Sequence, residues 1–171
     1  MPSRMNKTRK EGFTIVEVLI VLAIIGLILL VVFLAVPALQ RNARNTQRST
    51  DVGNILSAIS EYVGNNNGQL PATNGSINGS GSQLTIGAQG SNQIPVQLGY
   101  YSVSDISITD NSPGNLSNPG NNNDASQRDK VRIVKGASCS TTTIGDAVPA
   151  SSRSFVALYY LEPDSKQCRS S

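Results

Sequence analysis

An apolar run of 19 residues, Val18 to Val36, limits most strongly what this chain can fold into. The run contains no charge, hydroxyl or amide, and Pro37 closes it. As a helix with a rise of ~1.5 Å per residue it would be about 28 Å long. That length matches the roughly 30 Å hydrocarbon core of a bilayer, so we predict a membrane-spanning helix.

The charge of the chain is concentrated at its amino terminus. The net charge is +3, but residues 1–12 contain four basic residues and one acid. Residues 13–171 contain ten of each sign and are neutral. Because basic flanks stay in the cytoplasm, this leader predicts that the carboxyl-terminal part of the chain lies outside the membrane.

One acid, Glu17, stands directly before the apolar run. An unpaired charge buried in lipid costs several kcal/mol. Glu17 therefore either needs a partner or serves only to complement the dipole at the amino end of the helix.

The residues around Glu17 resemble the processing site of type IV pilins and their relatives. The stretch is Gly12-Phe13-Thr14-Ile15-Val16-Glu17-Val18-Leu19. In that family a membrane-embedded prepilin peptidase cuts after the glycine and methylates the new amino-terminal phenylalanine. The resemblance implies cleavage after Gly12 and N-methylation of Phe13. The amine so exposed at Phe13 can pair with Glu17 of a neighbouring subunit and set the stagger between subunits.

The resemblance also assigns two positions in the stem, Gly26 and Pro37, which we expect to give it flexibility. Gly26 corresponds to the stem glycine of the family. Pro37 lies about three positions after the usual stem proline, where this chain has Leu34. The residue before the cleavage-site glycine is often basic, and here it is Glu11.

Residues 38–63 are expected to continue the helix beyond the membrane. Apolar residues recur there at helical spacing and form one face that would pack under a head: they are Val52, Ile55, Leu56, Ile59 and Val63. Gly64 is expected to cap the end of this helix. Arg41, Arg44 and Arg48 form a basic stripe, which we interpret as a solvated face near the lipid headgroups.

The remaining residues, 64–171, predict a small head. Asn, Gly and Ser dominate residues 64–93 and 111–126, which we interpret as irregular connectors. Strands are predicted in four places: within Ile94–Ile108, at Val131–Ile133, over Ser154–Leu161 and around Cys168. Three or four antiparallel strands laid on the helix would make an α+β fold, as in the pilin architecture.

The predicted organisation has four parts: a cleaved leader over 1–12, a transmembrane or filament-core helix over 13–37, an amphipathic helix over 38–63, and the head over 64–171. The head contains both cysteines, Cys139 and Cys168, which we expect to form a disulfide in the oxidising exterior. Histidine is absent and no catalytic motif is recognisable, so we expect neither enzymatic activity nor a cofactor.

Two surfaces of the head could bind other molecules. Arg128, Lys130 and Arg132 alternate, and with Tyr159 and Tyr160 as stacking surfaces they could contact DNA. We favour a plain solvated strand face, because Asp129 and the neutral overall charge weaken any positive field. The segment from Asp110 to Asp129 is rich in oxygen ligands, but its spacing matches no defined calcium loop.

The expected function is that of a structural subunit in a type IV pilus-like filament that supports adhesion, twitching motility or DNA uptake. Its partners would be identical or related pilin subunits, the prepilin peptidase and the assembly platform in the cytoplasmic membrane. Two alternatives remain: a pseudopilin of a secretion or competence system, and a secreted or single-span anchored binding protein. Val36-Pro37-Ala38 would be the signal-peptidase site of the secreted form.

Overall fold

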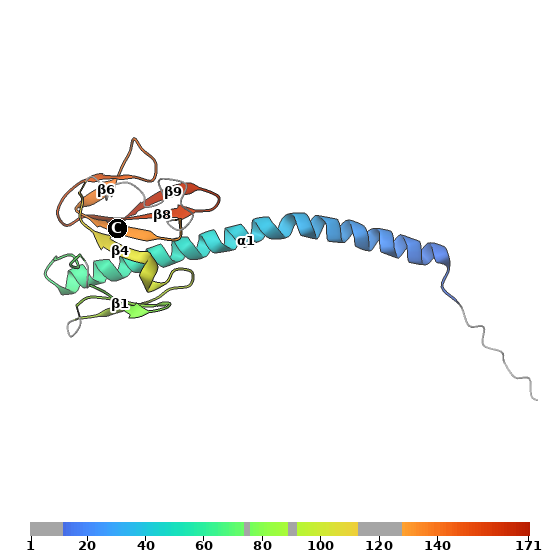
Figure 1. Cartoon of the computed structure of the whole chain (residues 1–171), viewed down its shortest axis with the longest axis horizontal. Helices are drawn as coiled ribbons and strands as arrows, with labels where there is room; N and C mark the ends of the chain where they lie inside the picture. Colours follow the sequence, from blue (N-terminus) through green and yellow to red (C-terminus); the bar gives the residue numbers. More distant parts are fainter. Residues whose placement is uncertain (1–11, 74–75, 89–91, 113–127) are drawn as a thin grey trace, which may run out of the picture. The chain divides into compact units, whose positions relative to one another are not determined.

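The computed structural model describes residues 12–73, 76–88, 92–112 and 128–171 (Figure 1). One helix, α1 (Ile15–Asn65), includes both the apolar run and the amphipathic segment. The chain divides into two compact units, Met1–Gln40 and Arg41–Ser171, which we describe separately. We call the described part of the first unit the stem and that of the second unit the head.

The stem has no core of its own. Its large apolar side chains between Ile15 and Val36 are 39–80% exposed, and the helix is long and apolar enough to span a membrane. Pro37 lies inside α1 without ending it. These side chains can be removed from water only by lipid or by other protein chains.

The end of α1 differs from the prediction. Gly64 lies within the helix, which continues to Asn65. The left-handed position that ends the helix is Asn67, with φ 54°, and the Gly68 N–H donates to the Val63 carbonyl at 2.9 Å. Asparagine tolerates this conformation because its short polar side chain can hydrogen-bond locally.

The head contains nine strands and a short 3-10 helix, η1 (Val103–Asp105), within the described residues. Sheet A is antiparallel and consists of β1 (Ile77–Ser80), β2 (Gln83–Ile86) and β3 (Ile94–Gln97). Sheet B has the order β4 (Ile106–Thr109), β5 (Val131–Lys135), β8 (Phe155–Leu161) and β9 (Ser165–Ser170). A separate pair consists of β6 (Ala137–Cys139) and β7 (Ala147–Pro149).

The predicted α+β fold is confirmed, with two corrections to the strands. Residues 64–93 are not wholly a connector, because β1 and β2 form a hairpin there and bury Leu84 and Ile86. The sheet is not wholly antiparallel either, since β4 pairs in parallel with β5, with Ile106 opposite Val131. The segment Ile94–Ile108 contains two strands that belong to different sheets, with η1 before the second.

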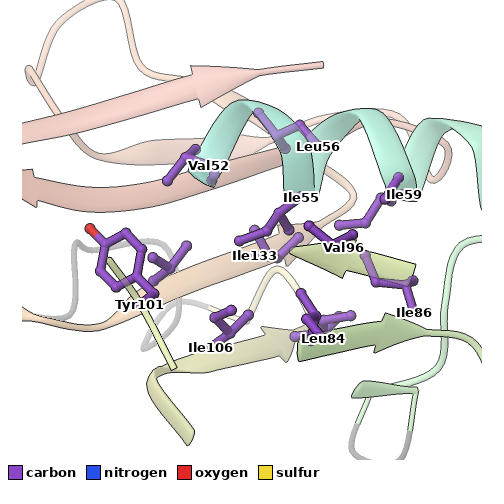
Figure 2. Close-up of a cluster of buried hydrophobic side chains, with 14 of the residues drawn as sticks. Val52, Ile55, Leu56, Ile59, Leu84, Ile86, Val96, Tyr101, Ile106 and Ile133 are labelled. Carbon is purple, nitrogen blue, oxygen red and sulfur yellow. The ribbon is translucent and has the colours of Figure 1, made fainter. Parts of the chain in front are cut away.

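The head half of α1 runs between sheet A and sheet B (Figure 1). Val52, Ile55 and Ile59 are at most 1% exposed and pack with residues of both sheets in one core (Figure 2). The predicted apolar helix face is therefore confirmed at these positions, while Val63 is only half-buried.

The far face of sheet B has a second, smaller core. Along β8, Phe155, Ala157 and Tyr159 face the helix, whereas Val156 and Leu158 face the β6–β7 pair. The strand is thus buried on both faces, which explains its nearly continuous apolar sequence.

Candidate functional site

The predicted cleavage site lies just before α1. Gly12, Phe13 and Thr14 precede the first helical turn. The Phe13 side chain is 89% exposed, and nothing lies within 4 Å of where a side chain at Gly12 would begin. The bond between Gly12 and Phe13 is therefore open to an enzyme in the isolated chain.

Glu17 has a local partner in Thr14. The Glu17 Oε2 atom accepts hydrogen bonds from the Thr14 N–H at 2.9 Å and from the Thr14 hydroxyl at 2.8 Å. In return, the Glu17 N–H donates to the Thr14 hydroxyl oxygen at 3.3 Å. This is a capping box, with Thr14 at the cap and Glu17 three residues later. The signature Thr14-Ile15-Val16-Glu17 is visible in the sequence, although we did not predict a capping box there.

The capping box uses only one oxygen of the Glu17 carboxylate. Its Oε1 atom accepts no hydrogen bond from the residues that the structure describes. A charged donor outside the chain can therefore reach Glu17 without breaking the cap.

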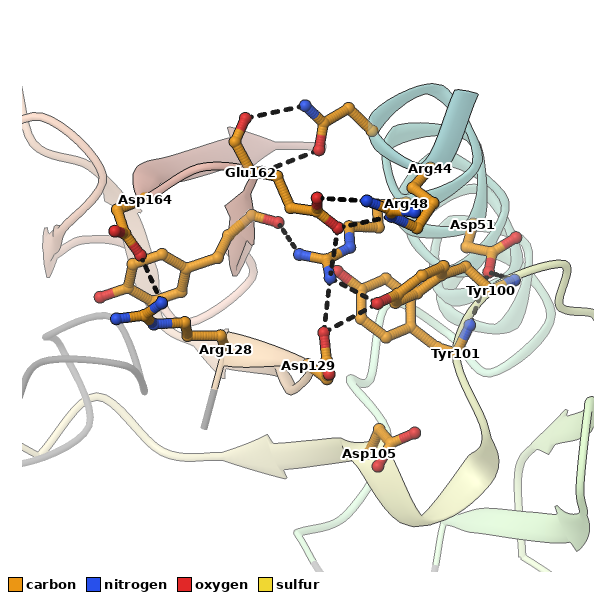
Figure 3. Close-up of polar contacts among 12 residues, drawn as sticks. Arg44, Arg48, Asp51, Tyr100, Tyr101, Asp105, Arg128, Asp129, Glu162 and Asp164 are labelled. Carbon is orange, nitrogen blue, oxygen red and sulfur yellow. Dashed lines mark hydrogen bonds and ion pairs between the residues drawn. The ribbon is translucent and has the colours of Figure 1, made fainter. Parts of the chain in front are cut away.

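The basic stripe on α1 is the predicted solvated face only at Arg41, because Arg44 and Arg48 bind residues of the head. Arg48 is 4% exposed and its guanidinium contacts three separate parts of the head (Figure 3). It donates to the Tyr160 carbonyl at 3.2 Å, to the Tyr100 hydroxyl at 2.5 Å and to Asp129 Oδ1 at 2.5 Å. It also lies over the Tyr100 ring, 4.3 Å from the ring centroid.

Arg44 and Asn45 bind the turn that follows β8. Arg44 donates two hydrogen bonds of 2.7 Å to the two carboxylate oxygens of Glu162. These bonds lower the pKa of Glu162 and raise that of Arg44. The Asn45 side chain bonds both the N–H and the carbonyl of Glu162, at 2.8 and 2.9 Å.

Asp51 organises the segment that leads from sheet A to η1. Its side chain is buried, and the carboxylate accepts the N–H groups of Gly99, Tyr100 and Tyr101 at 2.8, 2.8 and 3.1 Å. Arg48 and Asp51, three residues apart on one helix face, thus hold the loops of the head on α1. Burial raises the pKa of the neighbouring Tyr100 and Tyr101 hydroxyls, so both stay protonated.

A family model described as the prokaryotic N-terminal methylation motif matches residues 7–33. This match supports a signal peptide of the type IV pilin and pseudopilin class at the amino terminus of the chain. The match includes Gly12, Phe13, Glu17 and Gly26, and it ends before Pro37 and the head. Neither curated proteins nor solved structures gave a match to the pilin-like chain.

The head of this pilin-like precursor has the predicted disulfide. Cys139 at the end of β6 and Cys168 in β9 are joined, with their Cα atoms 5.6 Å apart. The bond ties the β6–β7 pair to the edge of sheet B, over the second core.

The candidate nucleic-acid surface of the head lacks the stacking rings that it would need. Tyr159 and Tyr160 are 5% and 4% exposed, so neither ring is available for stacking on a base. Arg128 pairs with Asp164 at 3.0 Å, and Arg132 is half-buried opposite Leu158, where burial lowers its pKa. The oxygen-rich segment Asp110–Asp129 lies mostly outside the described residues, and no group of three or more metal-ligating side chains occurs among those described.

Proposed function

We propose that the mature chain is a structural subunit of a type IV pilus-like filament and has no enzymatic activity. The observation that carries the proposal is the methylation motif over residues 7–33, joined to a stem whose apolar side chains are all exposed. In the precursor these side chains face lipid, and in the filament they face other stems. Such a head-to-tail assembly does not close on itself and therefore grows into a fibre.

Maturation would proceed by cleavage between Gly12 and Phe13 and by methylation of the Phe13 amine. The exposure of Phe13 and the open space beside Gly12 support access of the peptidase to this bond. The prepilin peptidase and the membrane assembly platform would be the partners at this stage. Adhesion, twitching motility or DNA uptake would be properties of the finished fibre.

Glu17 would set the register between subunits. Its Oε2 atom is engaged by Thr14, so Oε1 is the acceptor left for the Phe13 amine of a neighbouring stem. In an apolar filament core, leaving either charge without a partner costs about 3–5 kcal/mol. A wrongly staggered subunit would pay that cost, and a correctly staggered one would not.

The test is filament assembly by a Glu17→Val variant produced as the sole subunit. We expect it to be inserted and cleaved, because valine suits the membrane, but to give little or no sheared filament per mature subunit. Glu17→Asp should give an amount of filament between those of the parental chain and Glu17→Val. Glu61→Val, which removes an exposed acid from the head half of the same helix, is the matched control.

Filament at the parental level from Glu17→Val would refute the register role of Glu17. The same assay on the parental chain distinguishes a pilin from a pseudopilin. A pseudopilin would mature normally but give no long sheared fibre. A chain that is not cleaved at Gly12 would instead be a single-span anchored protein.

A further inference from the structure

A cavity of about 400 Å³ opens beside the first turns of the head half of α1. Its walls come from α1, from the start of β5 and from the turn between β8 and β9. The charged residues that line it are three arginines and three acids: Arg41, Arg48, Arg128, Asp129, Glu162 and Asp164. The cavity therefore offers both signs of charge within one small space.

Some of these charges are already used inside the head. Glu162 is held by Arg44, and Arg48 is buried against Asp129. Arg41 makes no hydrogen bond or ion pair with any residue that the structure describes, although its charge contributes to lowering the pKa of Glu162. The guanidinium of Arg41 is thus available to a ligand.

Two carboxylates that line the same cavity are accessible to solvent. The side chains of Asp129 and Asp164 are 57% and 59% exposed, and Arg128, the partner of Asp164, is 40% exposed. The solvent-exposed pair of Arg128 and Asp164 contributes little, so a ligand with both charges can replace it at small cost. Asp129 keeps Arg48 on its Oδ1 atom and can offer Oδ2 to the ligand. A simple anion would be repelled by three carboxylates, and a simple cation by three guanidinium groups. The lining therefore favours a ligand that carries both charges.

Arg41, which lines the cavity, follows closely in the chain on the apolar run. Arg41 is four residues after Pro37, which closes the apolar run. Along a helix this corresponds to about 6 Å. The headgroup layer adds roughly 5–7 Å to each side of the hydrocarbon core, so Arg41 lies at the level of lipid headgroups.

We propose that this cavity binds the headgroup of a zwitterionic phospholipid that carries a primary ammonium, while the precursor is in the membrane. The lipid phosphate would contact Arg41 and Arg128, and the ammonium would donate to Asp164 and Asp129. A primary ammonium fits better than a quaternary one because it has N–H donors for carboxylates. A quaternary ammonium prefers open aromatic faces, and Arg48 already lies over the Tyr100 ring.

The proposal rests on membrane anchoring of the precursor and not on filament assembly. The test uses the full-length precursor in detergent with equimolar phosphatidylethanolamine, phosphatidylcholine and phosphatidylglycerol. Native mass spectrometry then counts the lipids that stay bound. We expect phosphatidylethanolamine to be enriched about threefold over each of the other two, as one exposed charge-assisted contact would give.

Two variants assign the contacts. Arg41→Gln should reduce retention of all three lipids, whereas Asp164→Asn should keep lipid bound but abolish the preference for phosphatidylethanolamine over phosphatidylcholine. Arg153→Gln, at an exposed arginine outside the cavity, should change nothing. The mass of the disulfide-bonded form confirms in the same spectrum that each variant has closed its Cys139–Cys168 bond.

Three results would overturn the proposal. Equal retention of the three lipids by the parental chain would mean that there is no headgroup site. Preferential retention of phosphatidylglycerol would mean a site for anions, and an unchanged lipid pattern in Arg41→Gln would place the contact elsewhere. A chain that binds phosphatidylethanolamine as expected but never forms filaments would leave this proposal intact and refute only the proposed function.

Discussion

Arg48 is the side chain that binds three separate segments of the head. Its guanidinium bonds a carbonyl of β8, a carboxylate at the start of β5 and a hydroxyl between sheet A and η1. These partners lie 52 to 112 residues away along the chain. A single buried cation thus holds both sheets at one position on the helix.

Replacing this residue should weaken the head. Arg48→Met keeps much of the side-chain volume but leaves the Tyr160 carbonyl without its donor from α1, so we expect the free energy of unfolding to fall by about 1–3 kcal/mol. Asp129 adds little to the loss because its side chain is 57% exposed and can be hydrated. Urea unfolding of the full chain in detergent, followed by circular dichroism, measures the change. Arg153→Met is the control, and an equal change in both variants would contradict the role given to Arg48.

Glu162 should make the stability of the head depend on pH in the acid range. The hydrogen bonds from Arg44 hold the pKa of Glu162 below its ordinary value in the folded chain. The stabilisation is therefore complete above the unfolded pKa of about 4.3 and is lost as the pH falls toward the lower folded pKa. Glu162→Gln should show a smaller drop in Tm between about pH 6 and about pH 3 than the parental chain does. A drop as large as the parental one would show that the Arg44 pair does not contribute.

Among the elements of the fold, the β1–β2 hairpin depends most closely on a glycine. Gly79 has φ 132°, and a side chain there would begin 2.0 Å from the Gln83 carbonyl oxygen. The residues of this hairpin are mostly Asn, Gly, Ser and Gln, which is why the sequence suggested a connector. Only Leu84 and Ile86, two residues apart, signalled a strand with one buried face.

Two glycines in this hairpin allow a matched comparison. Gly79→Ala must move the backbone of β2 and should destabilise the head by about 2 kcal/mol or more. Gly81, with φ 59° and open space around it, should cost only about 1 kcal/mol when replaced by alanine. Urea unfolding of the two variants gives the difference. Equal losses would mean that the contact with Gln83 is not what requires glycine at position 79.

The β6–β7 pair depends on its disulfide, because only a small core lies beneath it. Closing a loop of 29 residues contributes about 3.6 kcal/mol in the chain-entropy estimate. Replacing both cysteines by serine should lower the stability by that order and open the residues after Gly136 to protease. Limited proteolysis followed by mass spectrometry locates the first cuts. First cuts in the β1–β2 hairpin instead would show that β6 and β7 do not need the bond.

The elements that could be predicted from the sequence are those with local signals. The apolar run, the helical spacing of Val52, Ile55 and Ile59, and the alternation around Ile133 each lie within a few residues. Burial of Arg48 could not be predicted, because its partners are 52 to 112 residues away from it along the chain. The same holds for the parallel pairing of β4 with β5, which brings Ile106 opposite Val131 across a long connection.

At the scale of the whole molecule, α1 carries two different surfaces. Before residue 40 its apolar side chains are exposed, and from Arg48 to Ile59 it forms the centre of a folded head. The mature chain from Phe13 onward is neutral, so its assembly would depend on apolar burial and on the charge pair at Glu17 rather than on net charge. The proposed assembly requires that the leader be removed.

Mass spectrometry of the mature amino terminus therefore tests the central claim most directly. We predict a chain that has lost residues 1–12 and begins at N-methylated Phe13. Gly12→Val should block the cut, because the peptidase must fit a backbone without a side chain at that position. A mature chain that begins at Leu39, or a full-length chain in the parental strain, would contradict the account.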